Sequence, residues 1–221
     1  MTDPIITVQG EFSAWYPAER GTASVTVQFD GPERDAVFAG AVASADALRG
    51  LIERDFDRNA GPITRWSSDS VRVWSERPWN ADGAQLPLVF HAAVDFSARF
   101  SDFEVLARWV ESAVAIDGVT VASIAWELTD ATRTGATVEV RSRAVKDAVA
   151  KASVYAQSIG LGSVTAVALA DPGMLGDPAG GSSPSMSRAA MLKSFDSGQQ
   201  LALKPEQIEV AAAVDARFIA R

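Results

Sequence analysis

The chain has 221 residues, enough for one large domain or two small ones, and its 48% hydrophobic and 22% charged residues are typical of a folded globular protein. Its net charge of -8 argues against a nucleic-acid partner, because phosphate binding needs a concentrated cationic surface. The lack of cysteine excludes disulfides, thiolate metal ligands and a cysteine nucleophile.

The sequence predicts neither a membrane span nor a signal peptide. No stretch approaches the roughly 18 uninterrupted apolar residues that a membrane-spanning helix needs. The first residues, MTDPIITVQGEF, carry no cationic segment before an apolar run, so we expect a cytoplasmic protein. A chain whose signal peptide had been removed would look the same, which leaves a periplasmic or extracellular location open.

The first half of the chain predicts two strands, a helix and a further strand. Residues 5–14 fit a strand in which Gly10 marks a bulge or a close backbone approach, and residues 22–29 alternate as a half-buried strand does. The segment 30–33 has the acidic cap, the proline and the glutamate of a helix start. The apolar face of this helix comprises Val37, Ala41, Ala45, Leu48 and Ile52. Residues 63–76 then predict one strand.

A second unit of the same kind follows. Leu88, Phe90, Ala92, Val94 and Phe96 alternate on one side of a strand that starts near residue 86. Ser101 with Glu104 forms a second capping box, and Asp117-Gly118 ends the helix before a strand at 119–128. The apolar face of this helix comprises Phe103, Leu106, Ala107, Val110 and Val114. The repeated order suggests a structural duplication over about 5–76 and 86–170.

A third helix precedes two further strands. Its apolar stripe comprises Val145, Ala148, Val149, Ala152, Tyr155 and Ile159. Its start falls between Asp130 and Thr137, because residues 137–140 also fit a strand. Gly160 stands where a helix end favours a left-handed residue, and Val164 to Ala170 have strand composition. The last strand places Ile208, Val210, Ala212, Val214, Ala216 and Phe218 on one face.

Between the last two strands, residues 171–205 are rich in Gly, Pro and Ser and predict a long loop, of the kind that is usually functional, partner-bound or disordered. The whole chain therefore predicts a single α+β domain over residues 1–221. In this fold, repeated strand-helix-strand units pack their helices on an antiparallel or mixed sheet.

Three segments carry a resemblance to a known family: ITVQGEF near the start, RAVKDAVAKASVYAQSIGLGSVTAVALADPG in the second half and KPEQIEVAAAVDARFIA at the end. They resemble the SIMPL-domain family, a family of unknown function that includes exported bacterial antigens. The resemblance covers nearly the whole chain and implies an α+β fold, self-assembly into rings or channel-like oligomers in some members, and no established enzymatic activity. The chain departs from the family in WYPAERGTA, before the second strand, and at Glu206-Gln207.

The residues themselves predict no catalytic, cofactor or metal site. His91 is the single histidine, and no nucleophile-elbow motif accompanies it, so we expect no Ser-His catalysis. One histidine cannot supply a histidine-based metal cluster, and the acidic residues lack EF-hand spacing. Gly160-Leu161-Gly162 lacks the third glycine and the preceding strand of a dinucleotide fingerprint. We expect a protein that is not an enzyme and needs no cofactor.

Aromatic residues give the remaining functional signal. Trp66, Trp74 and Trp79 cluster in the sequence around one strand and, with Phe90, form either part of the core or an interface or ligand groove. Two functions stay open. The first is a non-enzymatic protein that forms a homo-oligomer; the second is a small-molecule or peptide-binding module with an aromatic-lined groove.

Overall fold

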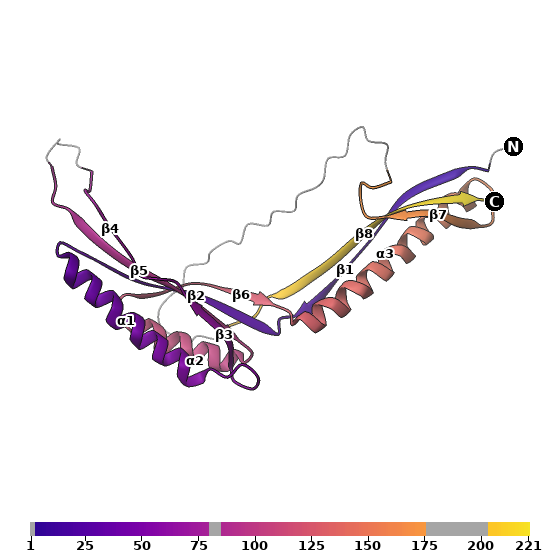
Figure 1. Cartoon of the computed structure of the whole chain (residues 1–221). Coiled ribbons are helices and arrows are strands. Elements are labelled where there is room, and N and C mark those ends of the chain that lie inside the picture. Colours follow the sequence, from indigo (N-terminus) through magenta and orange to yellow (C-terminus); the bar gives the residue numbers. More distant parts are fainter. Residues whose placement is uncertain (1–2, 80–84, 176–202) are drawn as a thin grey trace. The chain divides into compact units, whose positions relative to one another are not determined.

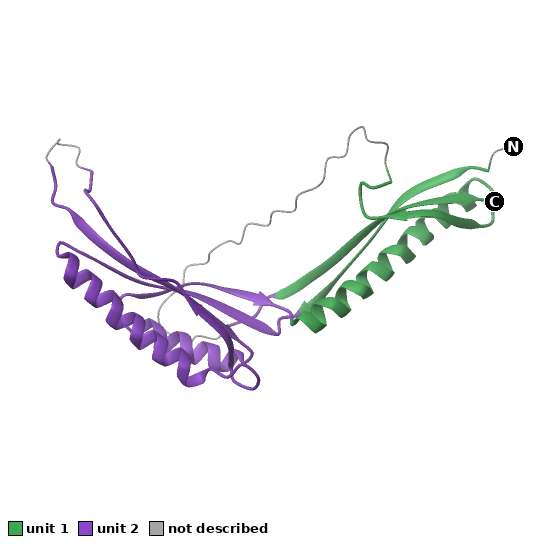
Figure 2. Cartoon of the chain, in the orientation of Figure 1, with its two compact units in different colours: residues 1–16, 129–197, 207–221 green, residues 17–128, 198–206 purple. Residues whose placement is uncertain are grey.

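The computed structural model describes residues 3–79, 85–175 and 203–221 (Figure 1). The described chain forms two compact units. Unit 1 contains residues 3–16, 129–175 and 207–221, and unit 2 contains residues 17–128 outside the gap together with 203–206 (Figure 2). Each unit has helix on one face of an antiparallel sheet, which confirms the predicted α+β class. Most of the predicted long loop, residues 176–202, lies outside the described residues.

Unit 2 is built on a five-stranded sheet with the order β3-β5-β2-β6, in which β4 also pairs with β5. The strands are β2 (Arg20–Gly31), β3 (Ile63–Ser68), β4 (Arg72–Glu76), β5 (Val89–Phe100) and β6 (Val119–Glu127). The sequence predicted one strand over residues 63–76. The structure corrects this to two strands, because β3 and β4 pair with successive stretches of β5 and residues 69–71 between them are not part of a strand.

The helices α1 (Arg34–Asp55) and α2 (Phe103–Val114) cover one face of this sheet, which we call the helix-covered face. The predicted alternation holds there, since Ala23, Val25 and Val27 of β2 are at most 2% exposed. Trp109 of α2 packs against Phe100 of β5, with ring centroids 5.2 Å apart. The predicted apolar face of α2 lacks Trp109, which is buried, and includes Val114, which is half exposed.

Both predicted helix starts need correction. The α1 helix begins after Glu33, whose side chain makes no capping hydrogen bond, because β2 continues to Gly31 and the Asp30 carboxylate already bonds His91 and Gln28. The cap of α2 is Asp102, not Ser101: its carboxylate accepts hydrogen bonds from the N–H groups of residues 104 and 105. Ser101 Oγ instead donates to the carbonyl of Gly61.

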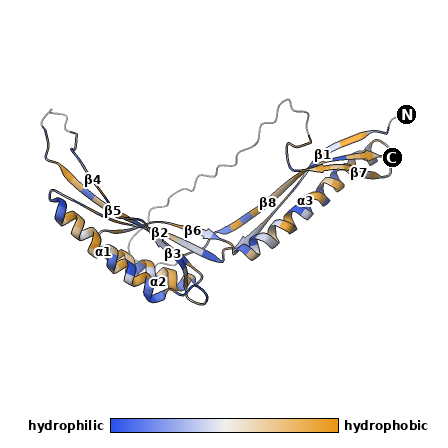
Figure 3. Ribbon diagram, viewed as in Figure 1, coloured by the Kyte–Doolittle hydropathy of each residue, from blue (hydrophilic) through white to orange (hydrophobic). Residues whose placement is uncertain are grey.

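Unit 1 is built on a three-stranded sheet with the order β1-β8-β7. Its strands are β1 (Ile5–Pro17), β7 (Val164–Ala170) and β8 (Gln207–Ala220), and α3 (Asp130–Ser158) packs on one face. The predicted alternation of the last strand holds at Ala216 and Phe218, which are buried against α3. The α3 helix starts at Asp130 after a Thr129 cap, so the alternative of a strand at residues 137–140 is wrong. In Figure 3, α3 alternates between polar and apolar colours along its length.

The buried stripe of α3 repeats at every fourth residue. It comprises Ala136, Val140, Ala144, Ala148, Ala152 and Ala156. Four residues turn an α-helix by 40° more than one full turn, so this stripe winds slowly around the helix and follows the twist of the sheet beneath it. The predicted stripe shares only Ala148 and Ala152 with the observed one as buried positions. Tyr155 and Ile159 are more than half exposed.

Small side chains let α3 approach the sheet closely at Gly10. A Cβ atom on Gly10 would overlap the carbonyl oxygen of Ala144 and would lie 2.7 Å from the Cβ of Ala148. The close backbone approach predicted from Gly10 is therefore confirmed. Gly160 has φ +80° after the end of α3, as predicted for its place at a helix terminus.

The two strand-helix-strand copies that suggested a duplication, β2-α1-β3 and β5-α2-β6, both belong to unit 2. Unit 1 instead combines strands from both ends of the chain: Ala220 N–H donates to Pro4 O at 3.0 Å. The compact units thus follow boundaries other than those of the predicted copies.

Candidate interaction surfaces

The four aromatic residues selected from the sequence lie on two different faces of the unit 2 sheet. Trp66 pairs in register with Ala98 and, like Phe90, packs half-buried against the helix-covered core. Trp74 pairs with His91 on the opposite face, which we call the polar face. Trp79 follows β4 and is 87% exposed. The structure therefore does not bring these four side chains into one groove.

His91 is held on the polar face by neighbours from two strands. Its Nδ1 lies 2.6 Å from Asp30 Oδ1, and its ring stacks on Trp74 with centroids 5.1 Å apart. The hydrogen bond with His91 lowers the pKa of Asp30, although partial burial opposes this shift. The other ring nitrogen, Nε2, is buried, has no hydrogen-bond partner among the described residues and lies 3.7 Å from Glu76 Oε1.

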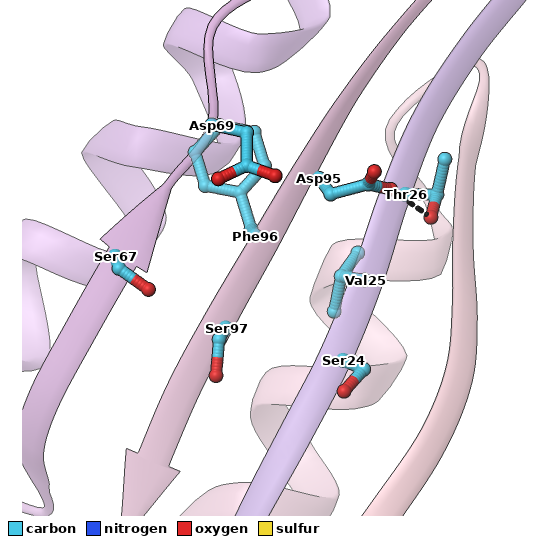
Figure 4. Close-up of a pocket in the computed structure, with 8 residues that line it drawn as sticks. All are labelled: Ser24, Val25, Thr26, Ser67, Asp69, Asp95, Phe96 and Ser97. Atoms are coloured by element: carbon cyan, nitrogen blue, oxygen red, sulfur yellow. Dashed lines mark hydrogen bonds between the residues drawn. The ribbon is translucent and has the colours of Figure 1, made fainter.

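A ladder of serines crosses the polar face at the other end of β5. Ser67, Ser97, Ser24 and Ser123 occupy one register row over four strands. Beside this row lies a shallow hollow of about 250 Å³, and its polar lining includes Asp69 and Asp95. Figure 4 shows three of these serines on neighbouring strands.

Of the two carboxylates that line this hollow, that of Asp95 is occupied by pairing within the polar face. Asp95 accepts a hydrogen bond from Thr26 Oγ1 at 2.6 Å and forms an ion pair with Arg72 at 2.6 Å. Ser97 lies six positions after His91 along β5, which is about 20 Å in a strand. The serine row and the histidine therefore cannot act as one nucleophile-base pair.

Unit 1 differs from the polar face of unit 2, because it exposes many apolar side chains. Ten of the sixteen exposed large hydrophobic residues in the described chain belong to this smaller unit. They are Ile5, Trp15, Val138, Val149, Val154, Tyr155, Ile159, Val167, Leu169 and Met174. Conversely, only Phe218 and Val140 among the ten largest fully buried side chains come from unit 1. The sequence could not reveal this difference, since it depends on the narrow alanine stripe of α3.

The two edges of the unit 1 sheet also differ. At the β1 edge, the N–H of Glu11 donates to Asp147 Oδ2 at 2.8 Å, and Lys151 Nζ donates to the carbonyl oxygen of Gln9 at 3.0 Å. Asp147 and Lys151 are themselves paired at 2.8 Å. Side chains of α3 thus satisfy edge groups of β1 that would otherwise be open to another strand.

The pKa shifts of Asp147 and Lys151 favour the ionised form of both side chains. The Lys151 hydrogen bond and then the Glu11 N–H lower the pKa of Asp147, and the Asp147 hydrogen bond raises the pKa of Lys151. The β7 edge differs in composition, because Val164 to Ala170 contain no charged residue and no proline.

Other site types have no support in the described part of the chain. Within it, no group of three or more His, Asp or Glu side chains is arranged to hold a metal ion. None of its helices is both long and apolar enough to cross a membrane.

Comparison with known proteins gives a family and little else. The model of the SIMPL family, described as a protein of unknown function (DUF541), matches residues 6–218. No curated protein matches the chain.

Two solved structures show weak similarity. The crystal structure of AtUAH in complex with glyoxylate is 16% identical over 60% of this chain and 34% of that one, with a TM-score of 0.28. A protein described as an amidohydrolase/peptidase from Burkholderia cenocepacia is 16% identical over 57% of this chain and 30% of that one, with a TM-score of 0.25. The chain thus spans about a third of each, and similarity at this level carries no functional argument.

Proposed function

Because the chain belongs to the SIMPL family, whose function is unknown, we propose a function from its own structure: a non-enzymatic protein that acts by assembling into a homo-oligomer. The observation that carries this proposal is the exposed apolar surface of unit 1. Monomeric proteins rarely expose large contiguous apolar patches, and those that occur usually mark an interaction site.

The construction of unit 1 supports assembly. Its sheet is covered on one face by one helix, and the buried residues of that helix are alanines except for Val140. Each alanine buries little apolar area, so unit 1 gains less from its own core than unit 2 does. Covering Val167 and Leu169, each about half exposed, would add the burial that the isolated unit lacks.

The polar face of unit 2 supports a role other than catalysis. His91 is engaged by Asp30 and Trp74, and the serine row lies too far along β5 to be activated by it. Asp95 is already bound by Thr26 and Arg72. A binding module with an aromatic groove has weaker support, because Trp66 and Trp74 lie on opposite faces.

Light scattering combined with native mass spectrometry tests the assembly. We expect the purified chain to have a mass that is a multiple of its 23.4 kDa monomer mass at micromolar concentration. A uniform 23.4 kDa species at high micromolar concentration would contradict the proposal.

A second experiment tests the absence of enzymatic activity. We expect no turnover of ester, peptide or glycoside substrates that depends on His91. If such an activity were found and then lost in His91→Ala with the circular dichroism spectrum retained, the non-enzymatic assignment would be wrong.

A further inference from the structure

We propose that the β7 edge of unit 1 is the surface through which two copies of this chain pair, strand against strand, in an antiparallel arrangement. This inference rests on the proposed assembly and adds which element makes the contact. An edge strand with open backbone groups is a template for another strand unless side chains protect it. Among the two edges of this sheet, β1 has such protection from Asp147 and Lys151.

The hydrogen-bond pattern shows which groups β7 offers. Ser163 and Arg221 exchange both of their backbone hydrogen bonds, at 2.9 and 3.0 Å, just before β7 begins. Because donors and acceptors alternate along an antiparallel pair, the N–H and C=O groups of Val164 and Ala166 point away from β8. They therefore face outward, along the free edge of the sheet.

Apolar side chains accompany these backbone groups. Val167 and Leu169 are 50% and 51% exposed, and Leu169 pairs in register with Ala216, on the face that carries α3. On α3, the residues just before the buried alanines contact β1, as Asp147 shows. Val149 follows a buried alanine, so it lies on the opposite flank, toward β7, and is 40% exposed.

The sheet edge of unit 2 at β6 is a weaker candidate. Its large apolar residues, including Val121, Ile124 and Trp126, already pack against the helix-covered core. None of the exposed large hydrophobic residues of the described chain lies on β6. The β7 edge thus combines outward backbone groups with uncovered apolar side chains, and the β6 edge does not.

A second copy of the chain fits this edge because the edge is uncharged. Each copy carries a net charge of -8, so copies repel one another wherever their acidic residues meet. The strand VTAVALA has no charge and can pair with itself without such repulsion. A two-fold axis between the two β7 strands would join the sheets in the order β1-β8-β7-β7-β8-β1. Both α3 helices then lie on the same side, where their Val149 and Leu169 side chains meet.

The described residues that follow β7 do not cover the free edge of this strand. Gly173 N–H donates to Asp215 Oδ2 at 2.7 Å, and Arg217 Nη2 donates to the carbonyl of Leu175 at 2.9 Å. Both contacts hold residues 173–175 against β8, the central strand. The described residues that follow β7 thus turn back toward the sheet.

The test compares three variants of the full chain by light scattering. Leu169→Lys places a charge at the apolar edge, and Ala166→Pro removes an outward N–H without touching the β7-β8 ladder. We expect both to halve the mass of the oligomer or to shift its dissociation to at least tenfold higher concentration. Ala150→Lys, the same kind of apolar-to-charged change at an exposed residue of α3 that is not among the large exposed hydrophobic residues of unit 1, should leave the mass unchanged.

Amide hydrogen exchange gives a readout that a folding defect would not mimic. In the wild-type oligomer we expect the Ala166 amide to be protected, and in Leu169→Lys to exchange at least tenfold faster while the buried core amides of β8 stay protected. If the wild type is an oligomer and both edge variants keep its mass, the β7 assignment is wrong while assembly stands. A monomeric wild type would instead overturn the proposed function itself.

Discussion

At Gly10, β1 and α3 approach each other so closely that a Cβ atom has no room. We expect Gly10→Ala to destabilise unit 1 by about 3 kcal/mol, the upper end for overpacking, because the new Cβ meets backbone atoms of Ala144 and Ala148 that cannot move separately. Urea denaturation followed by circular dichroism measures the change. The matched control is Gly135→Ala in α3, where nothing lies within 4 Å.

That control should be neutral or stabilising by up to about 1 kcal/mol, because alanine favours a helix interior over glycine. Equal stability losses in the two variants would contradict the close contact at Gly10.

Asp147 should make the stability of unit 1 depend on pH in the acid range. Its pKa in the folded chain lies below the ordinary value of 3.8, so the ionised form stabilises the fold above that value, and this contribution is lost as the pH falls through the folded pKa. We therefore expect Asp147→Asn to be less stable than wild type at pH 7 and equal to it once Asp147 is protonated. Urea titrations at pH 7 and at successively lower pH values, down through the folded pKa of Asp147, measure how the difference changes. A difference that stays constant over this whole range would contradict the assigned ion pair with Lys151.

Single residues show both what the sequence could predict and what it could not. The roles of Gly10 and Gly160 were predictable, because glycine alone allows the close backbone approach at Gly10 and readily adopts the positive φ at Gly160. The separation of Trp66 from Trp74 was not, since it depends on the break between β3 and β4 and on their separate registers with β5. The hydrogen bond between His91 and the Asp30 carboxylate, 61 residues away, likewise could not be predicted from the residues around either of them.

At the scale of the element, α3 depends on a narrow face of alanines. Ala152 is fully buried, so Ala152→Arg forces a charge and several methylenes into the contact with the sheet, and we expect a loss of about 3 kcal/mol or more. Ala150→Arg, two residues earlier on an exposed side of the same helix, should change stability by less than about 0.5 kcal/mol. Thermal melts of both variants test the pair, and matching melting temperatures would show that α3 does not pack through this stripe.

Most elements could be predicted because their signals are periodic. The strands β2, β5 and β8 alternate between buried and exposed residues as period-two patterns require. The stripe of α3 was partly wrong because a period of 3.6 assigns the large residues Tyr155 and Ile159 to the buried face, whereas the observed period of four selects alanines. The size of the side chain, not its hydrophobicity, decides which residues of α3 can face the sheet.

For the whole molecule, assembly should make thermal stability depend on protein concentration. An oligomer stabilises its folded subunits by mass action, so we expect the melting temperature to rise by a few degrees when the concentration increases a hundredfold. Differential scanning calorimetry at two concentrations measures the shift. A melting temperature that is independent of concentration, with reversible unfolding, would argue that the subunits do not stabilise one another.

The fold class was predictable from the order of elements, but the division into units was not. Sequence order suggested two consecutive copies, whereas the structure places β1 beside β8 through contacts such as Asp3 with Arg221 at 3.0 Å. Pairing between strands this far apart in the chain is set by the completed core. The exposed apolar surface of unit 1 could not be predicted either, because the sequence of β7 is typical of a buried strand.

The central place of β8 has a consequence for the order in which a ribosome can produce a folded chain. Residues 17–128 carry all five strands and both helices of unit 2, so this unit can form while later codons are still being translated. The sheet of unit 1 has to wait, because β1 and β7 are joined within it through β8, which is synthesised after both of them. During that interval β1 and the apolar residues of α3 have no complete sheet to pack against, and such transiently exposed apolar surface is prone to aggregation.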